Sequence, residues 1–147
     1  MNHHMKRTMR TLSVFVCLAA LVSAGAACKK AADEPGTASP VRVTDLELGR
    51  SLAADKTIAD ETSEFRPTDT IYLSVVTDGS APQATLAARW TYQDGQVVKE
   101  LSENIAPTGR SRTEFHIAKP DGWPAGKYSV AVSLNGAAAG TKDFEVK

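Results

Sequence analysis

The chain has 147 residues, with 17 basic and 17 acidic side chains, so its formal net charge at pH 7 is zero. This balance gives no basic excess of the kind that nucleic-acid binding needs, and we expect no nucleic-acid partner. The length suits one folded domain of ordinary size.

The N-terminal segment has the pattern of an export signal. An uncharged run extends over residues 11–27. It is preceded by three basic side chains, those of Lys6, Arg7 and Arg10. The run ends in small residues directly before Cys28. A charged start, an apolar stretch and a small-residue exit are typical of a signal peptide, which we predict over residues 1–27. Its removal leaves the mature chain with three more acidic than basic side chains.

Small residues running into Cys28 resemble the signal of bacterial lipoproteins, whose cysteine is lipidated and becomes the new N-terminus. That signal usually has Leu three residues before the cysteine, where this chain has Gly25. The resemblance implies lipidation of Cys28 and a membrane anchor. Two alternatives stay open: cleavage after Ala26 by ordinary signal peptidase, and retention of the run as a transmembrane anchor. The run barely reaches the roughly 20 apolar residues that a bilayer core needs.

The cysteine content favours lipidation. Cys17 lies in the apolar run and leaves with the signal, so Cys28 is the one cysteine of the mature chain. A single thiol in an oxidising compartment calls for an explanation, which lipidation supplies. Lys29 follows the cysteine, and in lipoproteins Asp at that position retains the protein at the inner membrane. The resemblance therefore implies lipid anchoring in the cell envelope, at the outer membrane and facing the periplasm.

A tether follows the cysteine. Residues 29–40 contain no large apolar side chain, so they cannot bury enough surface to offset the entropy lost on ordering. We therefore predict that residues 28–40 are the lipidated cysteine and a flexible linker, and that residues 41–147 are the folded domain.

Apolar side chains in the domain alternate with period two, which indicates strands. Seven short strands are expected, around residues 41–48, 71–75, 86–92, 97–101, 113–117, 128–134 and 144–146. This count predicts an all-β fold, a single seven-stranded Ig-like β-sandwich. A bulge near Thr44 and Asp45 is needed to keep the first strand on one face. Residues 49–64 are either a short extra strand ending at Phe65 or a long connection.

Two dipeptides predict tight turns. Asp94-Gly95 predicts a two-residue hairpin, which pairs Tyr92 with Val97 and Arg89 with Glu100. The same loop at Asn135-Gly136 would send Phe144 to the solvent face. We therefore predict an odd-length loop or a glycine bulge around residues 135–137, so that Tyr128 pairs with Phe144.

Residues 123–136, followed by Phe144-Glu145-Val146, resemble the closing hairpin of many bacterial Ig-like and fibronectin-like domains. The shared pattern is a proline-glycine turn, a tyrosine opening an alternating strand, an Asn-Gly turn and a terminal Phe-x-Val. Tyr128 is near the place of a corner tyrosine, and Trp90 looks like the core tryptophan of that architecture. The resemblance implies the fold and little about function, because such sandwiches host many roles.

The mature chain has little catalytic or metal-binding potential. Its one histidine, His116, is expected to face outward from a strand, and no Gly-x-Ser-x-Gly sequence presents a nucleophile. One histidine and a lipidated cysteine do not make a nitrogen-sulfur metal site. The acidic residues of 55–64 lack the spacing of a calcium loop. We therefore predict no catalytic residues, no enzyme activity, no metal and no cofactor.

Four side chains are candidates for contacts with a ligand or partner: Trp123, Tyr72, Arg110 and Arg112. Each candidate also has a purely structural interpretation. Trp123 would fold back to close the end of the sandwich, and the two arginines would form a solvated rim. The sheet face that holds Tyr72 would be covered by residues 49–64. The leading hypothesis is a non-enzymatic accessory or adhesive-type lipoprotein that binds another envelope protein. The alternative is a module for glycan or another small ligand that uses Trp123, Tyr72 or Tyr92. The oligomeric state is not fixed by the sequence.

Overall fold

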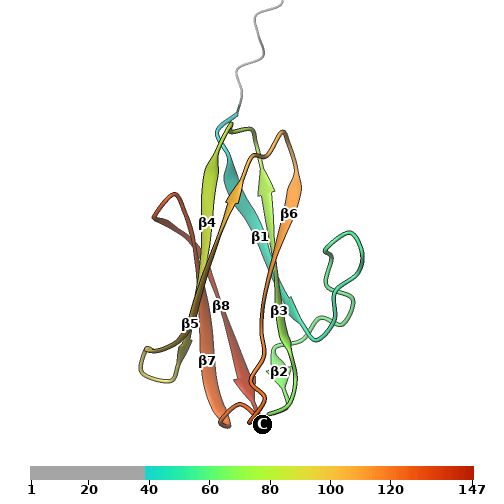
Figure 1. The fold of residues 1–147 in the computed structure, drawn as a ribbon, viewed down its shortest axis with the longest axis vertical. Coiled ribbons are helices and arrows are strands. Elements are labelled where there is room, and N and C mark those ends of the chain that lie inside the picture. Colours follow the sequence, from blue (N-terminus) through green and yellow to red (C-terminus); the bar gives the residue numbers. More distant parts are fainter. Residues whose placement is uncertain (1–38) are drawn as a thin grey trace, which may run out of the picture. The chain divides into compact units, whose positions relative to one another are not determined.

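The computed structural model describes residues 39–147 as two packed β-sheets (Figure 1). The strands are β1 (Arg42–Gly49), β2 (Glu64–Phe65), β3 (Ile71–Asp78), β4 (Ala84–Tyr92), β5 (Gln96–Ile105), β6 (Ser111–Ile117), β7 (Gly126–Leu134) and β8 (Ala137–Val146). The predicted signal peptide, Cys28 and most of the tether lie outside the described residues. Within residues 39–147, no helix is long and apolar enough to cross a membrane.

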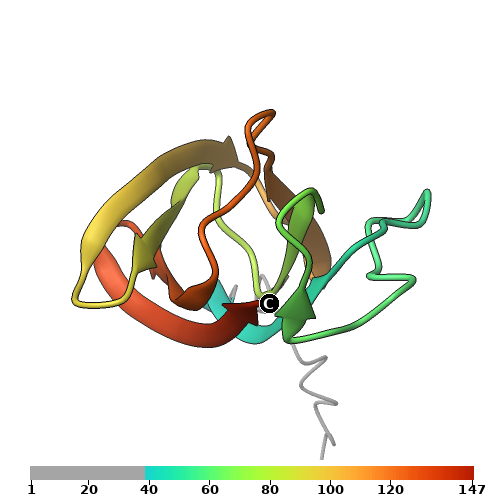
Figure 2. The same cartoon turned by 90° about the horizontal axis from the view of Figure 1, so that it is seen from below.

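The strand order is β1-β3-β6 in one sheet and β2-β8-β7-β4-β5 in the other. The two layers are seen end-on in Figure 2. All neighbours are antiparallel except β2 and β8, which are parallel. The chain therefore changes sheets between β1 and β2. The predicted all-β sandwich is confirmed.

The strand count is eight, so the prediction of seven is wrong by one. The additional strand is β2, and it ends at Phe65 as one of the two options for residues 49–64 allowed. Phe65 is 2% exposed and packs edge-on against Phe144, with ring centroids 5.4 Å apart. Burial of one aromatic ring holds this two-residue segment beside β8, and so short a segment carries no alternation that a sequence pattern can reveal.

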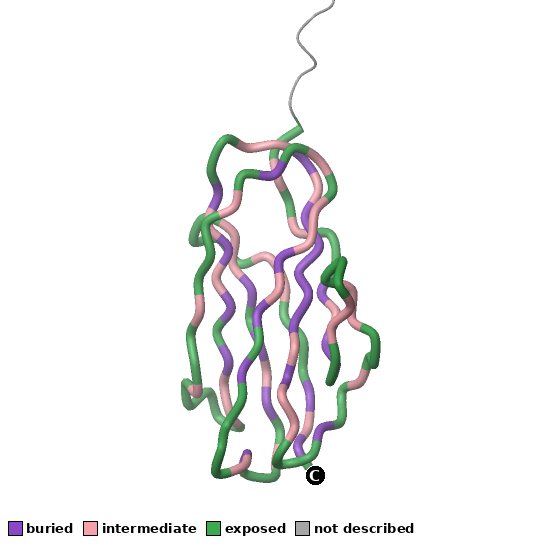
Figure 3. The backbone as a smooth tube through the Cα atoms, turned by 45° about the vertical axis from the view of Figure 1, so that its right-hand side comes forward, coloured by how far each residue is buried: buried purple, intermediate pink, exposed green. Residues whose placement is uncertain are grey.

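The core lies between the sheets, and buried and exposed positions alternate along the strands (Figure 3). Trp90, the predicted core tryptophan, has no exposed surface and lies edge-on to Phe144 at 6.0 Å. The hydroxyl of Tyr128 donates a 2.7 Å hydrogen bond to the carbonyl of Pro124, four residues upstream. This is the bond that defines a corner tyrosine, so that prediction is also confirmed.

The β4–β5 hairpin departs from its predicted register at the turn. Arg89 faces Glu100 as predicted, but Tyr92 faces Gln96 rather than Val97. The loop has three residues, because Gln93 stays bound to β7 through its backbone N–H, which donates to the carbonyl of Lys127. Gln93 and Gly95, rather than Asp94 and Gly95, have positive φ angles. A bulge restores the register further along β5.

The β7–β8 hairpin pairs Tyr128 with Phe144, as predicted. The loop itself is the two-residue Asn135-Gly136 turn, with positive φ at both residues. The extra residue lies in β8, at a register shift opposite Val132 and Ser133. The predicted bulge therefore exists, but it is displaced from the loop into the strand. The bulge predicted in β1 is confirmed between Val43 and Asp45.

Candidate functional site

The described chain enters the sandwich at one end and finishes at the other (Figure 1). At the entry end, the backbone N–H of Ser80 donates a 2.9 Å bond to the carbonyl of Ser39 and pins the start of the domain. The C-terminus lies at the opposite end, which also carries the β4–β5 turn and the β6–β7 connection. Strands of eight to ten residues separate the two ends by about 30 Å.

An open hollow of about 310 Å³ lies at this opposite end, and we call it the distal hollow. Aromatic and aliphatic side chains make up most of its wall, and Lys119 is the one charged residue among those that line it. The lining is Tyr92, Gln96, Val97, Val98, Lys119, Trp123, Pro124 and Tyr128. Among residues 39–147, Val97 is the only large apolar side chain that is exposed, at 44%.

Two tyrosines form the wall between β4 and β7. Their rings lie 4.7 Å apart, and both hydroxyls donate to the turn before β7, Tyr92 to the Ala125 carbonyl and Tyr128 to the Pro124 carbonyl. Gly126 makes this approach possible, since a Cβ there would lie 2.9 Å from the Tyr92 ring, and its φ of 143° disfavours other residues. The wall is therefore held rigidly, which suits a preformed site.

Burial shapes the chemistry of this wall. Tyr128 is 3% exposed, and its burial, followed by the neighbouring Tyr92, raises the pKa of the Tyr128 phenol. The hydroxyl is neutral at physiological pH and already bonded to the chain. The hollow therefore offers apolar surface and ring edges rather than an acid or a base.

Trp123 reaches the hollow only by an edge, because the ring is 6% exposed. Its indole N–H donates a 3.0 Å bond to the Asp69 carbonyl, and the ring lies edge-on to Tyr128. Trp123 thus plugs the sandwich end, the structural alternative that the sequence left open. This burial argues against Trp123 as a stacking platform for a sugar.

Tyr72 lies on the outer face of the three-stranded sheet, opposite His116, with ring centroids 5.5 Å apart. Residues 50–61, which we call the outer loop, lie against this face. The Ser74 hydroxyl donates a 2.7 Å bond to the Lys56 carbonyl, and Ile58 contacts Gly49 on β1. Ser74 and Val76 are fully buried although they point away from the core. The face that holds Tyr72 is thus the seat of residues 49–64.

Arg50 fastens the base of the outer loop. Its guanidinium contacts the carboxylates of Asp60 and Asp69, each at 3.1 Å, and the carbonyl of Glu64 at 2.8 Å. Hydrogen bonding to Asp60, foremost, raises the pKa of Arg50. Asp60 of the outer loop therefore acts in holding the chain, and no group of three or more metal-ligating side chains occurs within residues 39–147.

The two candidate arginines lie in different surroundings. Arg112 donates 2.7 Å and 3.2 Å bonds to Glu47 and to the Ser74 hydroxyl, and the bond to Glu47 is the main cause that raises its pKa. Its charge is already used within the sheet. Arg110 is exposed on the connection before β6. The two do not converge on one anion site.

His116 is exposed, and its Nδ1 lies 3.2 Å from the Glu114 carboxylate. A hydrolase that used His116 as its base would need a nucleophile such as the hydroxyl of Ser111 or Ser129, and both of these hydroxyls have other partners. The Ser111 hydroxyl is 2.9 Å from that of Thr77, and the Ser129 hydroxyl faces the Lys142 carbonyl. The structure therefore does not bring His116 together with either hydroxyl.

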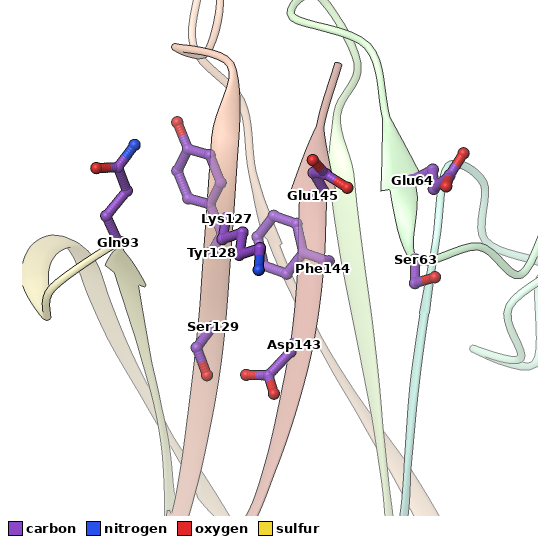
Figure 4. A pocket seen from close by; sticks show the side chains of 9 residues that line it. All are labelled: Ser63, Glu64, Gln93, Lys127, Tyr128, Ser129, Asp143, Phe144 and Glu145. Carbon is purple, nitrogen blue, oxygen red and sulfur yellow. The ribbon is translucent and has the colours of Figure 1, made fainter.

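A larger hollow, of about 490 Å³, lies on the outer face of β7 and β8 beside β2 (Figure 4). Lys127 projects from β7, and Asp143 and Glu145 project from β8 around it. Lys147 bonds the carboxylates of Glu64 and Glu145 at its border. Exposed pairs of this kind contribute about 0–1 kcal/mol, so we interpret this hollow as a solvated polar face.

A scan against protein-family models and a search of curated proteins both give no match. Among solved structures, an immunoglobulin-like protein from Pseudomonas aeruginosa has a TM-score of 0.50 and 16% identity, over 76% of this chain and 100% of that chain. A CARDB domain from Pyrococcus furiosus in complex with di-metal ions has a TM-score of 0.46 and 9% identity, over 76% of this chain and 89% of that chain.

An alkylpurine DNA glycosylase from Pseudomonas fluorescens has a TM-score of 0.47 and 19% identity, and this chain spans only 30% of its length. At such identities the likeness concerns the fold alone. Together with the two-sheet topology and the corner tyrosine, the likeness to the Pseudomonas aeruginosa protein identifies residues 39–147 as an all-β, immunoglobulin-like sandwich.

Proposed function

We propose that this protein is a lipid-anchored accessory module of the cell envelope, which uses its distal hollow to bind another envelope protein. The observation that carries the proposal is the position of the hollow. It is apolar, rigidly walled, and lies at the end of the sandwich opposite to the point where the chain enters.

Anchoring through Cys28 explains why a binding site would lie at the end of the sandwich that is remote from the N-terminal tether. The 12 residues from Lys29 to Pro40 reach at most about 40 Å when fully extended. The sandwich adds about 30 Å to this reach. The tether and the length of the sandwich together let the distal hollow reach partners in the periplasm at a distance from the membrane that holds the lipid. Lys29 after the cysteine supports the outer membrane as the anchoring site.

The chemistry of the hollow supports binding without catalysis. Its polar tyrosine hydroxyls are satisfied by backbone carbonyls, so a partner would gain mainly from covering apolar surface. A rim valine above a floor of fixed aromatic rings is the arrangement that an inserted apolar side chain of a partner fits. The burial of Trp123 removes the main support for the glycan hypothesis.

Photocrosslinking in intact cells tests the proposal. A benzoylphenylalanine at Gln96, on the rim of the distal hollow, should crosslink to a discrete envelope protein. The same group at Ala137, the exposed first residue of β8, is the matched control and should give no such product. Val97→Asp should abolish the Gln96 product without changing the level of the protein.

Crosslinks of equal strength from Gln96 and Ala137, or a product that survives Val97→Asp, would contradict a role for the distal hollow. If no protein product forms at either site, the protein-binding function itself is rejected. Membrane fractionation of the same cells tests the anchoring separately.

A further inference from the structure

Strand β5 forms one edge of the five-stranded sheet, because it pairs only with β4. It is ten residues long, and seven of its residues are exposed. The backbone groups on its free side have no strand partner within the described residues. An edge of this length is a template for a further strand unless its side chains oppose pairing.

Two charged residues of β5, Lys99 and Glu103, lie on the face of the sheet that is directed toward the core. Lys99 is paired with Trp90 and Glu103 with Leu86, and both of those β4 residues are fully buried. Lys99 and Glu103 are nevertheless exposed, because β5 lies at the border of the sandwich. Inward-facing charges on an edge strand discourage random pairing. Here their signs are opposite, and Leu101 lies midway between them.

This spacing makes β5 complementary to itself. When two copies of β5 pair antiparallel about a two-fold axis, facing residues must point to the same side of the joined sheet. This holds only if the pairing is centred on one residue, which then lies opposite the same residue of the other copy. Centring on Lys99, Glu100 or Glu103 would place like charges opposite each other. Centring on Ser102 would place Leu101 against Glu103. Centring on Leu101 places Lys99 of each copy opposite Glu103 of the other.

We propose that β5 is a homodimer interface, in which two copies of this chain join their five-stranded sheets edge to edge in the register centred on Leu101. Two Lys99–Glu103 pairs flank a Leu101–Leu101 contact, all on one face of the continuous sheet. Opposite charges in directly facing positions stabilise an antiparallel pair, and like charges destabilise it. Of the registers centred on residues 99–103, the one centred on Leu101 is the one that places opposite charges in facing positions.

The inference does not rest on the proposed function, although Gln96 and Val97 belong both to β5 and to the lining of the distal hollow. Lys99 and Glu103 lie outside that lining, so charge exchange at these two residues tests the dimer alone. A contact of one short strand per copy is small, so we expect a weak dimer in solution. Confinement of both copies to one membrane would raise their effective concentration and favour pairing.

Sedimentation of the purified full chain in detergent, over a range of concentrations, tests the interface by charge exchange. The wild type should show a monomer–dimer equilibrium. Lys99→Glu and Glu103→Lys should each weaken dimerisation at least tenfold, because each places two like-charge pairs across the axis. The double variant Lys99→Glu/Glu103→Lys should restore it to within about threefold of the wild type.

Lys142→Glu is the matched control, since it makes the same charge change at an exposed position of β8. It should leave the dimer unchanged. A wild type that stays monomeric up to about 1 mM overturns the proposal. A dimer that persists in both single variants, or that the double variant fails to restore, overturns the register and with it this interface.

Discussion

The ring of Tyr128 stacks on that of Phe144, with centroids 5.3 Å apart and planes inclined by 13°. The two residues face each other across β7 and β8, and each is less than 5% exposed. Tyr128 also contacts Trp123 and Tyr92, whereas Phe144 contacts Trp90 and Phe65. The pair thus joins the core of the sandwich to the wall of the distal hollow.

Tyr128→Ala and Phe144→Ala should each lower the free energy of unfolding by about 3–5 kcal/mol, because each leaves a cavity among fixed aromatic rings. The double variant should lose less than the sum of the single losses, since the stacked contact is removed only once. Denaturant unfolding of the four proteins measures this coupling.

Lys127→Ala and Asp143→Ala are the controls for that cycle, because both side chains are exposed on the reverse face of the same strands. Each should change the free energy of unfolding by about 0.5 kcal/mol or less. Strictly additive losses at residues 128 and 144 would show that the stacked rings do not support each other.

Alternation along the strands predicted the sandwich and the Tyr128–Phe144 pair, because one buried face imposes a strict parity on each strand. The same parity predicted that an extra residue lies near Asn135, but not its position in β8, which depends on backbone geometry at the turn. Strand β2 was only one of two options for its segment, since its stability comes from one distant contact, between Phe65 and Phe144. The distal hollow joins Tyr92 and Val97 to Trp123, and this meeting of the β4–β5 hairpin with the β6–β7 connection needs the tertiary fold.

Tyr128 should make the domain less stable in alkali. Burial raises the pKa of its phenol in the folded state above the value of about 10 expected when unfolded. The neutral form is therefore favoured by folding, and this contribution is present below pH 10 and is lost as the pH rises further. Tyr128→Phe should lower stability by about 1 kcal/mol at pH 8 through loss of one hydrogen bond.

The free energy of unfolding of Tyr128→Phe should then fall less steeply than that of the wild type between pH 10 and pH 11. Equilibrium denaturation at each pH gives both slopes. Parallel curves would contradict a buried, neutral Tyr128.

Gly49→Ala should dislodge the outer loop. A Cβ at Gly49 would collide with the side chain of Ile58 and the carbonyl of Asp60. We expect a loss of about 1–3 kcal/mol and faster proteolysis within residues 50–61. Ser51→Ala is the control, because the outer loop uses only the backbone of that residue in the bond from Ala59. Equal protease resistance in Gly49→Ala would show that the loop does not rest on β1.

Cys28→Ala should release the protein into the soluble fraction and abolish labelling by palmitate. In the proposed function, lipid chains on Cys28 are what holds this acidic domain stably on a membrane. Continued membrane association of the variant would indicate a retained N-terminal anchor instead. Lys29→Asp should move the protein to the inner membrane, and unchanged fractionation would reject the predicted sorting.

The outer loop departs from and returns to nearly the same point, because Gly49 bridges Glu61 and the backbone of Arg50 bonds that of Asp60. It is inserted between β1 and β2, which belong to different sheets. Its length therefore does not affect the register of strand pairing in either sheet. We therefore expect that this segment can be lengthened while the sandwich keeps its strand pairing, provided that the Lys56 carbonyl still reaches the Ser74 hydroxyl.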